Sequence, residues 1–312
     1  MCPGSAAAMN SNNTEKSVCV MDASGPLGHA LVARLLRRGY TVHAATYQSR
    51  PDEDHYDDHP RLKLFRADPF DYHAIADAVH GCSGIFAIFN TPQLDSTNLG
   101  VPPYHEEEAI VEAEVRAAQN VVEACAQTET MERVVFTSSV TAVVWKDKDD
   151  HRALDETSWS DLAFCTRFKL WHALAKTLSE KTAWALAMDR GVDMVAINAG
   201  LLTAPGLTAD HPYLKGAPNM YDHGVLVTVD VDFLADAHMA AYECPAAYGR
   251  YLCFNNAVCR PEDAAKLAQM LSSSSSAPPP SDELKVISQR IHTKKLNKLM
   301  LEFDSAIYGD LN

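Results

Sequence analysis

A short turn after the first apolar run of the chain carries residues that could hold a phosphate group. Residues 18–21 are apolar, as in a strand buried on both faces of a parallel sheet, and residues 22–28 form a turn that contains Gly25 and Gly28. Apolar residues then recur at helical spacing until Gly39, where the helix is expected to end. A strand, a glycine-containing turn and a helix place a dinucleotide pyrophosphate at the helix N-terminus, so this stretch indicates nucleotide binding.

One position of the turn departs from the usual glycine spacing. The pattern G-x-x-G-x-x-G requires glycine at positions 22, 25 and 28, but position 22 is Asp22. Aspartate tolerates a tight turn, and many turns between a strand and a helix look similar, so this motif alone leaves a nucleotide site and a purely structural turn equally open. A carboxylate ~6 Å from a pyrophosphate, at an effective dielectric of ~20, would cost roughly 3 kcal/mol, or about a hundredfold in affinity.

The elements that must position this turn alternate along the chain. This alternation predicts an α/β fold built on a doubly wound parallel sheet. After the first strand, further strands are predicted at 40–46, 62–65, 84–90, 133–136 (continuing to 139) and 192–198, and helices at 72–79, 106–126 and 169–188.

The remaining segments indicate a smaller C-terminal lobe. Residues 199–226 are rich in Gly, Pro and His, which suits loops around a substrate, and residues 227–231 are expected to return to the sheet. A helix is expected at 233–243 and a strand at 250–254, and residues from Leu284 are expected to close the lobe. The predicted units are a disordered tail at 1–16, a dinucleotide-binding domain at 17–198 with returning segments at about 225–255, and a substrate-binding lobe at 199–224 and 256–312 with a flexible, serine- and proline-rich stretch at 272–281.

The composition excludes several classes of partner. The 312 residues include 27 Lys and Arg against 41 Asp and Glu, and this net charge of −14 argues against nucleic acids and anionic membranes. No apolar run approaches the ~20 residues of a membrane span, and the first residues lack the basic and apolar regions of a secretory signal. The eight cysteines are scattered without a C-x-x-C pair, which favours reduced thiols in a cytoplasmic protein.

A pair of histidines raises the question of a metal site. His55 and His59 stand four residues apart among acidic residues. A solvated polar loop explains this composition as well, so no metal site is predicted.

Four longer stretches match a known family in order and spacing. They are RVVFTSSVTAVV (133–144), DETSWSDLAFC (155–165), LWHALAKTLSEKTAW (170–184) and GRYLC (249–253). On these residues the chain resembles the plant cinnamoyl-CoA reductase and dihydroflavonol reductase branch of the extended short-chain dehydrogenases, most closely the cinnamoyl-CoA-reductase-like group. The resemblance implies a Rossmann fold, NADP(H) as cofactor, and reduction of a phenylpropanoid thioester such as hydroxycinnamoyl-CoA, or a related carbonyl, in lignin synthesis or defence-linked phenolics.

The resemblance also implies a set of catalytic positions. In the family a tyrosine gives a proton to the carbonyl oxygen, a lysine four residues later binds the nicotinamide ribose and lowers the pKa of the tyrosine, and a serine holds the carbonyl. These roles correspond to Ser139, position 172 and Lys176, and the spacing of four puts the last two on one helical face. Position 172, however, is His172 rather than tyrosine.

The exchange of tyrosine for histidine changes the proton chemistry. A phenol with a pKa near ~10 becomes a useful acid beside a cation. An imidazolium beside Lys176 is disfavoured by the like charge, so His172 is expected to be mostly neutral at pH 7 and a weak acid. His172 could still donate a hydrogen bond, relay a proton through water, or merely fill the space of the tyrosine.

Two further departures concern the cofactor. Asp22 stands where the family has glycine, and Tyr47 stands where it has an arginine for the 2′-phosphate, although Arg50 is close enough in sequence to substitute for that arginine. No acid ends the second strand, which favours NADP over NAD, and Asp68 matches the family's residue near the adenine. The implied cofactor-binding set is Asp22, Ser24, Gly25, Leu27, Gly28, Tyr47, Arg50, Asp68 and Lys176.

Two functions therefore compete at this point. One is a cytoplasmic NADP-dependent reductase with an altered or impaired active site, favoured by Ser139, Lys176 and the two glycines of the turn. The other is a catalytically inactive, reductase-derived binding or regulatory protein, favoured by Asp22 and His172. The sequence identifies neither the substrate nor any protein partner.

Overall fold

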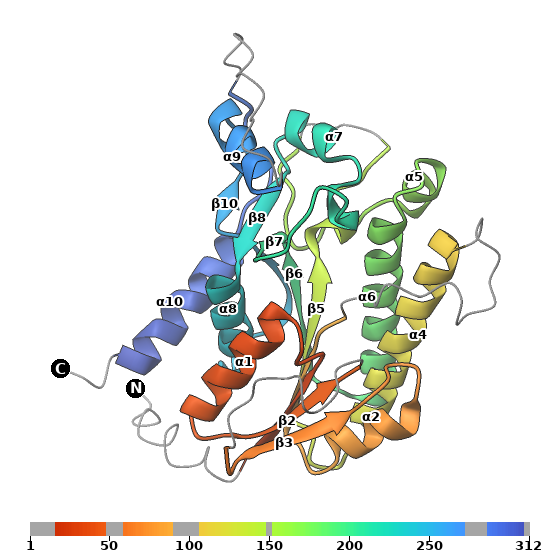
Figure 1. The fold of residues 1–312 in the computed structure, drawn as a ribbon, viewed down its shortest axis with the longest axis vertical. Coiled ribbons are helices and arrows are strands. Elements are labelled where there is room, and N and C mark those ends of the chain that lie inside the picture. Colours follow the sequence, from red (N-terminus) through yellow and green to blue (C-terminus); the bar gives the residue numbers. More distant parts are fainter. Residues whose placement is uncertain (1–15, 48–58, 90–105, 148–151, 272–285, 309–312) are drawn as a thin grey trace.

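The chain folds around a seven-stranded sheet in which every neighbouring pair of strands is parallel (Figure 1). The structure is a computed structural model that describes residues 16–47, 59–89, 106–147, 152–271 and 286–308. The strand order β3-β2-β1-β4-β5-β6-β9 confirms the predicted doubly wound α/β fold. The strands are β1 (Ser17–Met21), β2 (Thr41–Thr46), β3 (Leu62–Arg66), β4 (Gly84–Ala87), β5 (Arg133–Ser139), β6 (Met194–Ala199) and β9 (Gly249–Cys253).

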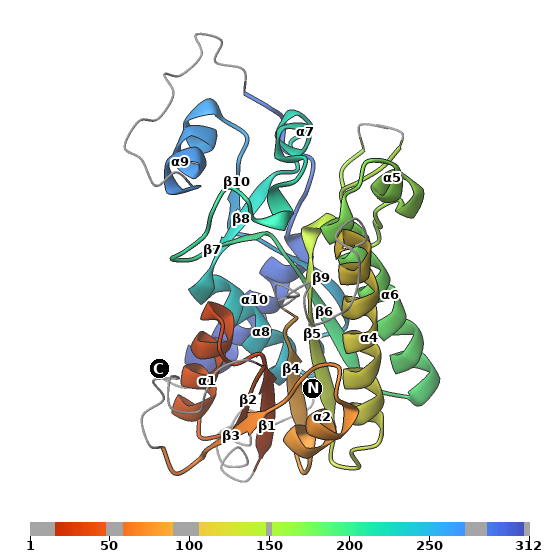
Figure 2. The same ribbon diagram turned by 45° about the vertical axis from the view of Figure 1, so that its right-hand side comes forward.

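Helices cover both faces of this sheet (Figures 1 and 2). Side chains from α1, α8 and α10 pack on one face, and side chains from α2, α4 and α6 pack on the other. The bounds are α1 (Pro26–Arg37), α2 (Tyr72–Val79), α4 (Glu106–Ala126), α6 (Trp171–Arg190), α8 (Val231–Glu243) and α10 (Lys294–Tyr308).

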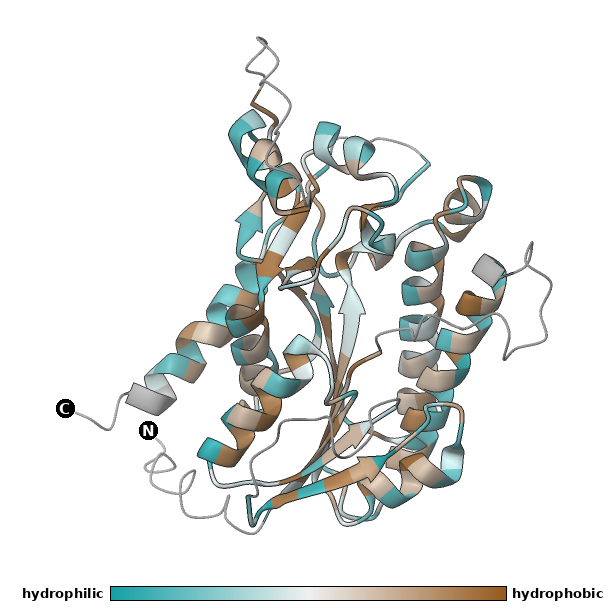
Figure 3. Ribbon diagram, viewed as in Figure 1, coloured by the Kyte–Doolittle hydropathy of each residue, from teal (hydrophilic) through white to brown (hydrophobic). Residues whose placement is uncertain are grey.

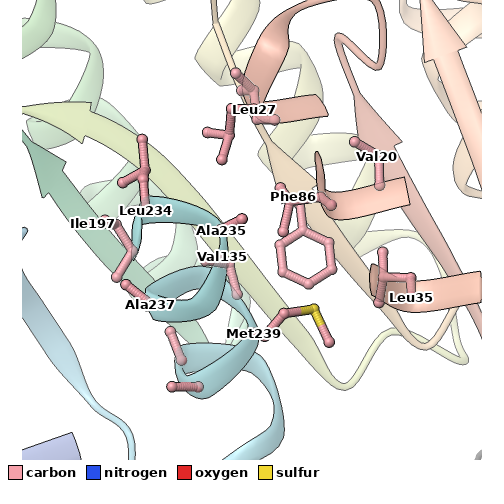
Figure 4. Close-up of a cluster of buried hydrophobic side chains, with 14 of the residues drawn as sticks. Val20, Leu27, Leu35, Phe86, Val135, Ile197, Leu234, Ala235, Ala237 and Met239 are labelled. Carbon is pink, nitrogen blue, oxygen red and sulfur yellow. The ribbon is translucent and has the colours of Figure 1, made fainter. Parts of the chain in front are cut away.

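The apolar runs of the sequence form the buried strands of the sheet, whose lower part is largely brown in Figure 3, whereas the upper end of β5 is pale. On β1, Val18 and Val20 belong to the cluster under α1 and α8, whereas Cys19 and Met21 belong to the cluster on the opposite face. Phe86 on β4 is fully buried in the first cluster, between side chains from α1 and α8 (Figure 4). Burial on both faces explains why these strands are apolar without alternation.

One segment lies in a different sheet from the one expected. The prediction that residues 227–231 return to the main sheet is wrong, because β8 (Val227–Asp230) pairs with β7 (Leu201–Thr203) and β10 (Asn256–Ala257) in a separate three-stranded sheet. The short helix α7 (Ala217–Asp222) follows β7 in this part of the chain. An apolar strand buried by a lobe has the same pattern as one buried in a main sheet, so the sequence does not distinguish them.

The described parts of 256–312 likewise do not form one lobe. Helix α9 (Pro261–Leu271) contributes to the cluster of the small sheet, but α10 packs on the main body. Leu296, Leu299 and Phe303 on α10 form an apolar stripe at helical spacing and join the cluster under α1 and α8.

The helix that carries positions 172 and 176 begins after a left-handed residue. Lys169 has φ +53°, which an L-residue seldom adopts, and it separates α5 (Leu162–Arg167) from α6. Helix α6 therefore spans Trp171–Arg190 rather than the predicted 169–188, and Gly191 ends it at φ +69°.

A buried ion pair joins α6 to the sheet. Glu180 is fully buried, and its carboxylate accepts hydrogen bonds from Arg250 on β9 at 2.7 Å and from Ser138 on β5 at 2.6 Å. Asn198 on β6 donates to the same carboxylate at 2.7 Å. Arg250 also donates to backbone carbonyls of the segment 156–158. The network thus connects a helix, three strands and a loop.

His238 on α8 is a second buried polar group. Its Nδ1–H donates to the carbonyl of Leu234 at 2.8 Å, and its Nε2 accepts from the hydroxyl of Thr137 at 2.8 Å. Both ring nitrogens are therefore used by the neutral imidazole. Burial lowers the pKa of His238 to about 4.

We predict that the protein loses stability as the pH falls from 7 to 5. A histidine whose folded pKa lies below its unfolded value takes up a proton on unfolding, so its contribution is present at neutral pH and is lost as pH falls from the unfolded towards the folded pKa. For His238 this loss is about 2 kcal/mol in the free energy of unfolding between pH 7 and 5. Urea unfolding at both pH values measures it. His238→Gln should remove that difference and the exposed His80→Gln should not; equal pH dependence in wild type and His238→Gln would contradict the assignment.

Candidate active site

A cavity of about 270 Å³ lies at the carboxyl ends of β1, β2 and β4. Its wall includes the turn after β1, Tyr47 after β2, Phe89 after β4, and Glu114 on α4. Because the strand order is β2-β1-β4, Tyr47 and Phe89 lie on either side of the β1 turn. Ligands of doubly wound sheets bind in a crevice at this switch point, so the cavity is the candidate cofactor site.

The turn has the geometry of a phosphate-binding loop. Gly25 is the N-cap of α1, Pro26 follows it, and no acidic residue lies in the first turn of the helix. A Cβ at Gly28 would lie 2.3 Å from the backbone oxygen of Asp22, so only glycine allows the turn to pack this closely. The N-terminal N–H groups and the positive end of the helix dipole are thus available to an anion at Gly25.

The backbone conformation of Asp22 explains why aspartate is tolerated in this turn, and its carboxylate explains why the turn would bind an anion less well. Its φ of +60° lies in the left-handed region, where glycine is favoured and aspartate is among the few other residues found. Its Oδ1 accepts the hydroxyl of Ser24 at 2.6 Å, and both residues line the cavity. The turn therefore keeps the shape that glycine would give it but carries a negative charge.

Of the residues expected near an adenosine, Tyr47 lines the cavity, and Asp68 stands between two lining residues, Ala67 and Pro69. Burial, then the negative charge of Asp68, raise the pKa of Tyr47, while the positive charge of Arg66 opposes this rise. Arg66 ends β3 opposite Thr46 in the sheet register. Leu27 buries its side chain in the core, away from the cavity, and Arg50 lies outside the described residues.

Lys176 has a partner that sequence reasoning missed. Its ammonium contacts Glu114 Oε1 at 2.9 Å and donates to the carbonyl of Phe89 at 2.9 Å. Glu114 is 3% exposed and lies on the helix face that also carries Val111 and Val121. An acidic residue within the apolar stripe of a helix was the available signal, but only the packing of α4 on α6 reveals its partner.

Ser139 ends β5, the strand beside β4. Its oxygen accepts two hydrogen bonds from Thr141, one from the backbone N–H at 3.1 Å and one from the hydroxyl at 2.9 Å. With its acceptor capacity used in this way, the serine hydroxyl is suited to act as a hydrogen-bond donor.

His172 lies one turn before Lys176 on α6, with the rings of His211 and Tyr213 each 6.3 Å away between centroids. Burial, then the charges of Lys176 and His211, lower the pKa of His172 well below its usual value. The direction is the one expected from the sequence, but burial rather than Lys176 is its largest cause. His172 therefore rests as a neutral imidazole at pH 7.

Tyr213 does not replace the missing tyrosine. It is 3% exposed, and its hydroxyl donates to the carbonyl of Val227 at 3.1 Å. Burial also raises the pKa of Tyr213. A phenol that is buried and bound to a carbonyl in this way is no proton donor for a substrate.

The described part of the chain shows neither a metal centre nor a membrane-spanning helix. Its residues include no group of three or more His, Cys, Asp or Glu placed to hold a metal ion. Of the histidine pair noted in the sequence, His59 accepts the backbone N–H of Arg61, and His55 lies outside the described residues. Within the same residues, no helix has the length and apolar character needed to span a membrane.

Known proteins resemble this chain over most of its length. A family model described as NAD(P)H-binding matches residues 23–203. Cinnamoyl-CoA reductase 1 of Petunia hybrida is 34% identical over 92% of this chain and 87% of its own length, and cinnamoyl-CoA reductase 2 of Arabidopsis thaliana is 34% identical over 92% and 88%. The crystal structure of vestitone reductase from alfalfa matches with a TM-score of 0.65 at 25% identity, covering 94% of this chain and 97% of that one.

Replacement of Asp22 by asparagine should tighten NADPH binding severalfold or more. Asparagine also tolerates the left-handed backbone and can accept the Ser24 hydroxyl, but it removes a charge that would cost about a hundredfold in affinity at close range. Isothermal titration calorimetry measures the change. Asp22→Gly should give at least the same gain, and Asp77→Asn, at an exposed position on α2, should give none. Unchanged affinity in both Asp22 variants would show that the carboxylate does not face the phosphates.

Proposed function

The chain belongs to the cinnamoyl-CoA reductase and dihydroflavonol reductase family of NAD(P)-dependent reductases, and we propose that it is an NADP-dependent reductase of a phenylpropanoid CoA thioester or related carbonyl, with an altered active site. The observation that carries this proposal is the placement of Lys176. Its ammonium is held by Phe89 and Glu114, both of which line the cavity that contains the Gly25 turn. The same cavity would thus take a phosphate at the Gly25 turn, with the lysine beside its wall.

The residues around the cavity suit a nicotinamide dinucleotide. The N-terminus of α1 and the close packing at Gly28 leave a backbone cradle for the pyrophosphate. Tyr47, Arg66 and Asp68 would surround the adenosine half, and Lys176 the nicotinamide half. When bound, the cofactor supplies a hydride to the carbonyl carbon of the substrate.

Residues of the protein would then bind and protonate the carbonyl oxygen of the substrate. Ser139, oriented by Thr141, would donate a hydrogen bond to this oxygen and hold it in place. His172 would supply the proton as negative charge develops there. Because neutral imidazole is a very weak acid, this transfer requires the small imidazolium fraction, and the burial of His172 keeps that fraction low.

A second function has specific support. A neutral His172 and a carboxylate at the turn after β1 would each weaken an ordinary reductase. A catalytically inactive, reductase-derived binding or regulatory protein accounts for both features. The two functions differ in turnover but share the fold and the cavity.

The cysteines and the named relatives support a cellular location and a substrate class for the proposed reaction. Seven cysteines of the described residues are free thiols, which supports a reducing, cytoplasmic location. The relatives named cinnamoyl-CoA reductase support a small-molecule substrate such as hydroxycinnamoyl-CoA, in lignin or defence-linked phenolic metabolism.

We predict that NADPH binds more tightly than NADH. No acid follows Thr46 at the end of β2, and Arg66 lies opposite it, where its guanidinium can pair with a 2′-phosphate. Calorimetry on Arg66→Ala should show about tenfold weaker NADPH binding and little change for NADH. Arg50→Ala, tested in parallel, shows whether that arginine shares the role. Equal affinity for the two cofactors in the wild type would overturn the assignment to NADP.

Replacement of His172 by tyrosine should raise the rate of hydride transfer to hydroxycinnamoyl-CoA, provided that NADPH binds. A phenol beside Lys176 is a competent acid, and a well-placed acid is worth roughly a hundredfold or more. Single-turnover oxidation of NADPH measures this step. Adding Lys176→Ala should abolish the gain, because the lysine contact with the ribose and the phenol is lost.

The pH dependence separates the possible outcomes. The wild-type rate should rise about tenfold per unit as pH falls below 7, since imidazolium is the acid and its pKa lies low, whereas His172→Tyr should lack this rise. If the wild type is active, but its rate neither rises as the pH falls nor increases in His172→Tyr, the proton comes from another group. A silent wild type that His172→Tyr combined with Asp22→Gly fails to rescue would favour the binding protein.

A further inference from the structure

Glu114 is a buried carboxylate with an unusual position. It lies on α4, is 3% exposed, and forms part of the cavity wall. Its Oε1 receives the ammonium of Lys176 at 2.9 Å and the hydroxyl of Ser179 at 3.2 Å. Two residues of α6 therefore hold the carboxylate in one orientation at the edge of the cavity.

A gain in folding stability does not by itself explain the buried pair of Glu114 and Lys176. Removing two charges from water costs several kcal/mol for each ion, and an apolar pair of similar size is often as stable or more stable. Neighbouring positions on the same face of α4, such as Val111 and Val121, are apolar and pack well. A carboxylate at this site is better explained by a ligand that it helps to bind.

The topology identifies the part of the ligand that would meet Glu114. Tyr47 follows β2, the Gly25 turn follows β1 and Phe89 follows β4, which is the order of these strands in the sheet. A dinucleotide with its pyrophosphate at the turn has one nucleoside near Tyr47 and the other near Phe89. Glu114 and Lys176 both lie at the Phe89 end, where the nicotinamide riboside belongs.

We propose that Glu114 binds the nicotinamide ribose together with Lys176, an inference that rests on the proposed function. A ribose diol both donates and accepts hydrogen bonds. The carboxylate accepts from one hydroxyl, and the ammonium, which has three N–H groups and uses two on Phe89 and Glu114, donates its third to the diol. Carboxylates commonly bind ribose hydroxyls at the other end of such cofactors.

The test compares a whole cofactor with half of one. Calorimetry on Glu114→Gln should show about tenfold weaker binding of NADPH, because a charge-assisted hydrogen bond is replaced by a neutral one. Binding of 2′,5′-ADP, which lacks the nicotinamide riboside, should stay within about twofold and also reports that the variant is folded. Glu112→Gln, at an exposed position on the same helix, should change neither.

The outcomes distinguish this inference from the proposed function. NADPH binding that is unchanged in Glu114→Gln, or an equal loss for NADPH and 2′,5′-ADP, would overturn the role of Glu114 alone. A wild type that binds 2′,5′-ADP but not NADPH, or neither, would overturn the proposed function as well. If Glu114→Gln does not fold, Glu114→Asp keeps the charge but withdraws it by one methylene, and it should weaken NADPH selectively.

Discussion

The buried pair between Glu180 and Arg250 is the contact on which the site depends most. Burying two charges is favourable only when their geometry and remaining hydrogen bonds are complete. Here the partners come from α6, β5, β6, β9 and the segment 156–158, so the network closes only when all of them are in place. Because α6 also carries His172 and Lys176, and Ser138 adjoins Ser139, the pair sets where the candidate catalytic residues lie.

The order of strands and helices was largely predictable because their patterns are local. The continuous apolar run at 18–21 and the glycine turn identify a buried strand followed by a helix, and the motif at 170–184 identifies α6. The placement of 227–231 and of α10 was not predictable, because an apolar pattern indicates that a segment is buried but not which surface covers it.

In the candidate site, too, residues within local motifs were predictable from the sequence, whereas contacts between distant parts of the chain were not. Asp22 and His172 are visible in the sequence because each stands within a recognisable motif. The contact of Glu114 with Lys176 spans two helices that are far apart in the chain, and Arg66 reaches the end of β2 only through strand pairing. The charges that surround a cofactor cavity therefore depend on contacts that no short pattern contains, even when the motifs that define the cavity are clear.

The left-handed backbone at Asp22 limits how this turn can change in evolution. Glycine, asparagine and aspartate are the residues that adopt such a conformation at low cost. An aspartate codon differs from a glycine codon only at its second base and from an asparagine codon only at its first. The turn can therefore gain or lose its charge by a single nucleotide change while its backbone stays the same, so related genes can differ in the charge of this turn without differing in fold.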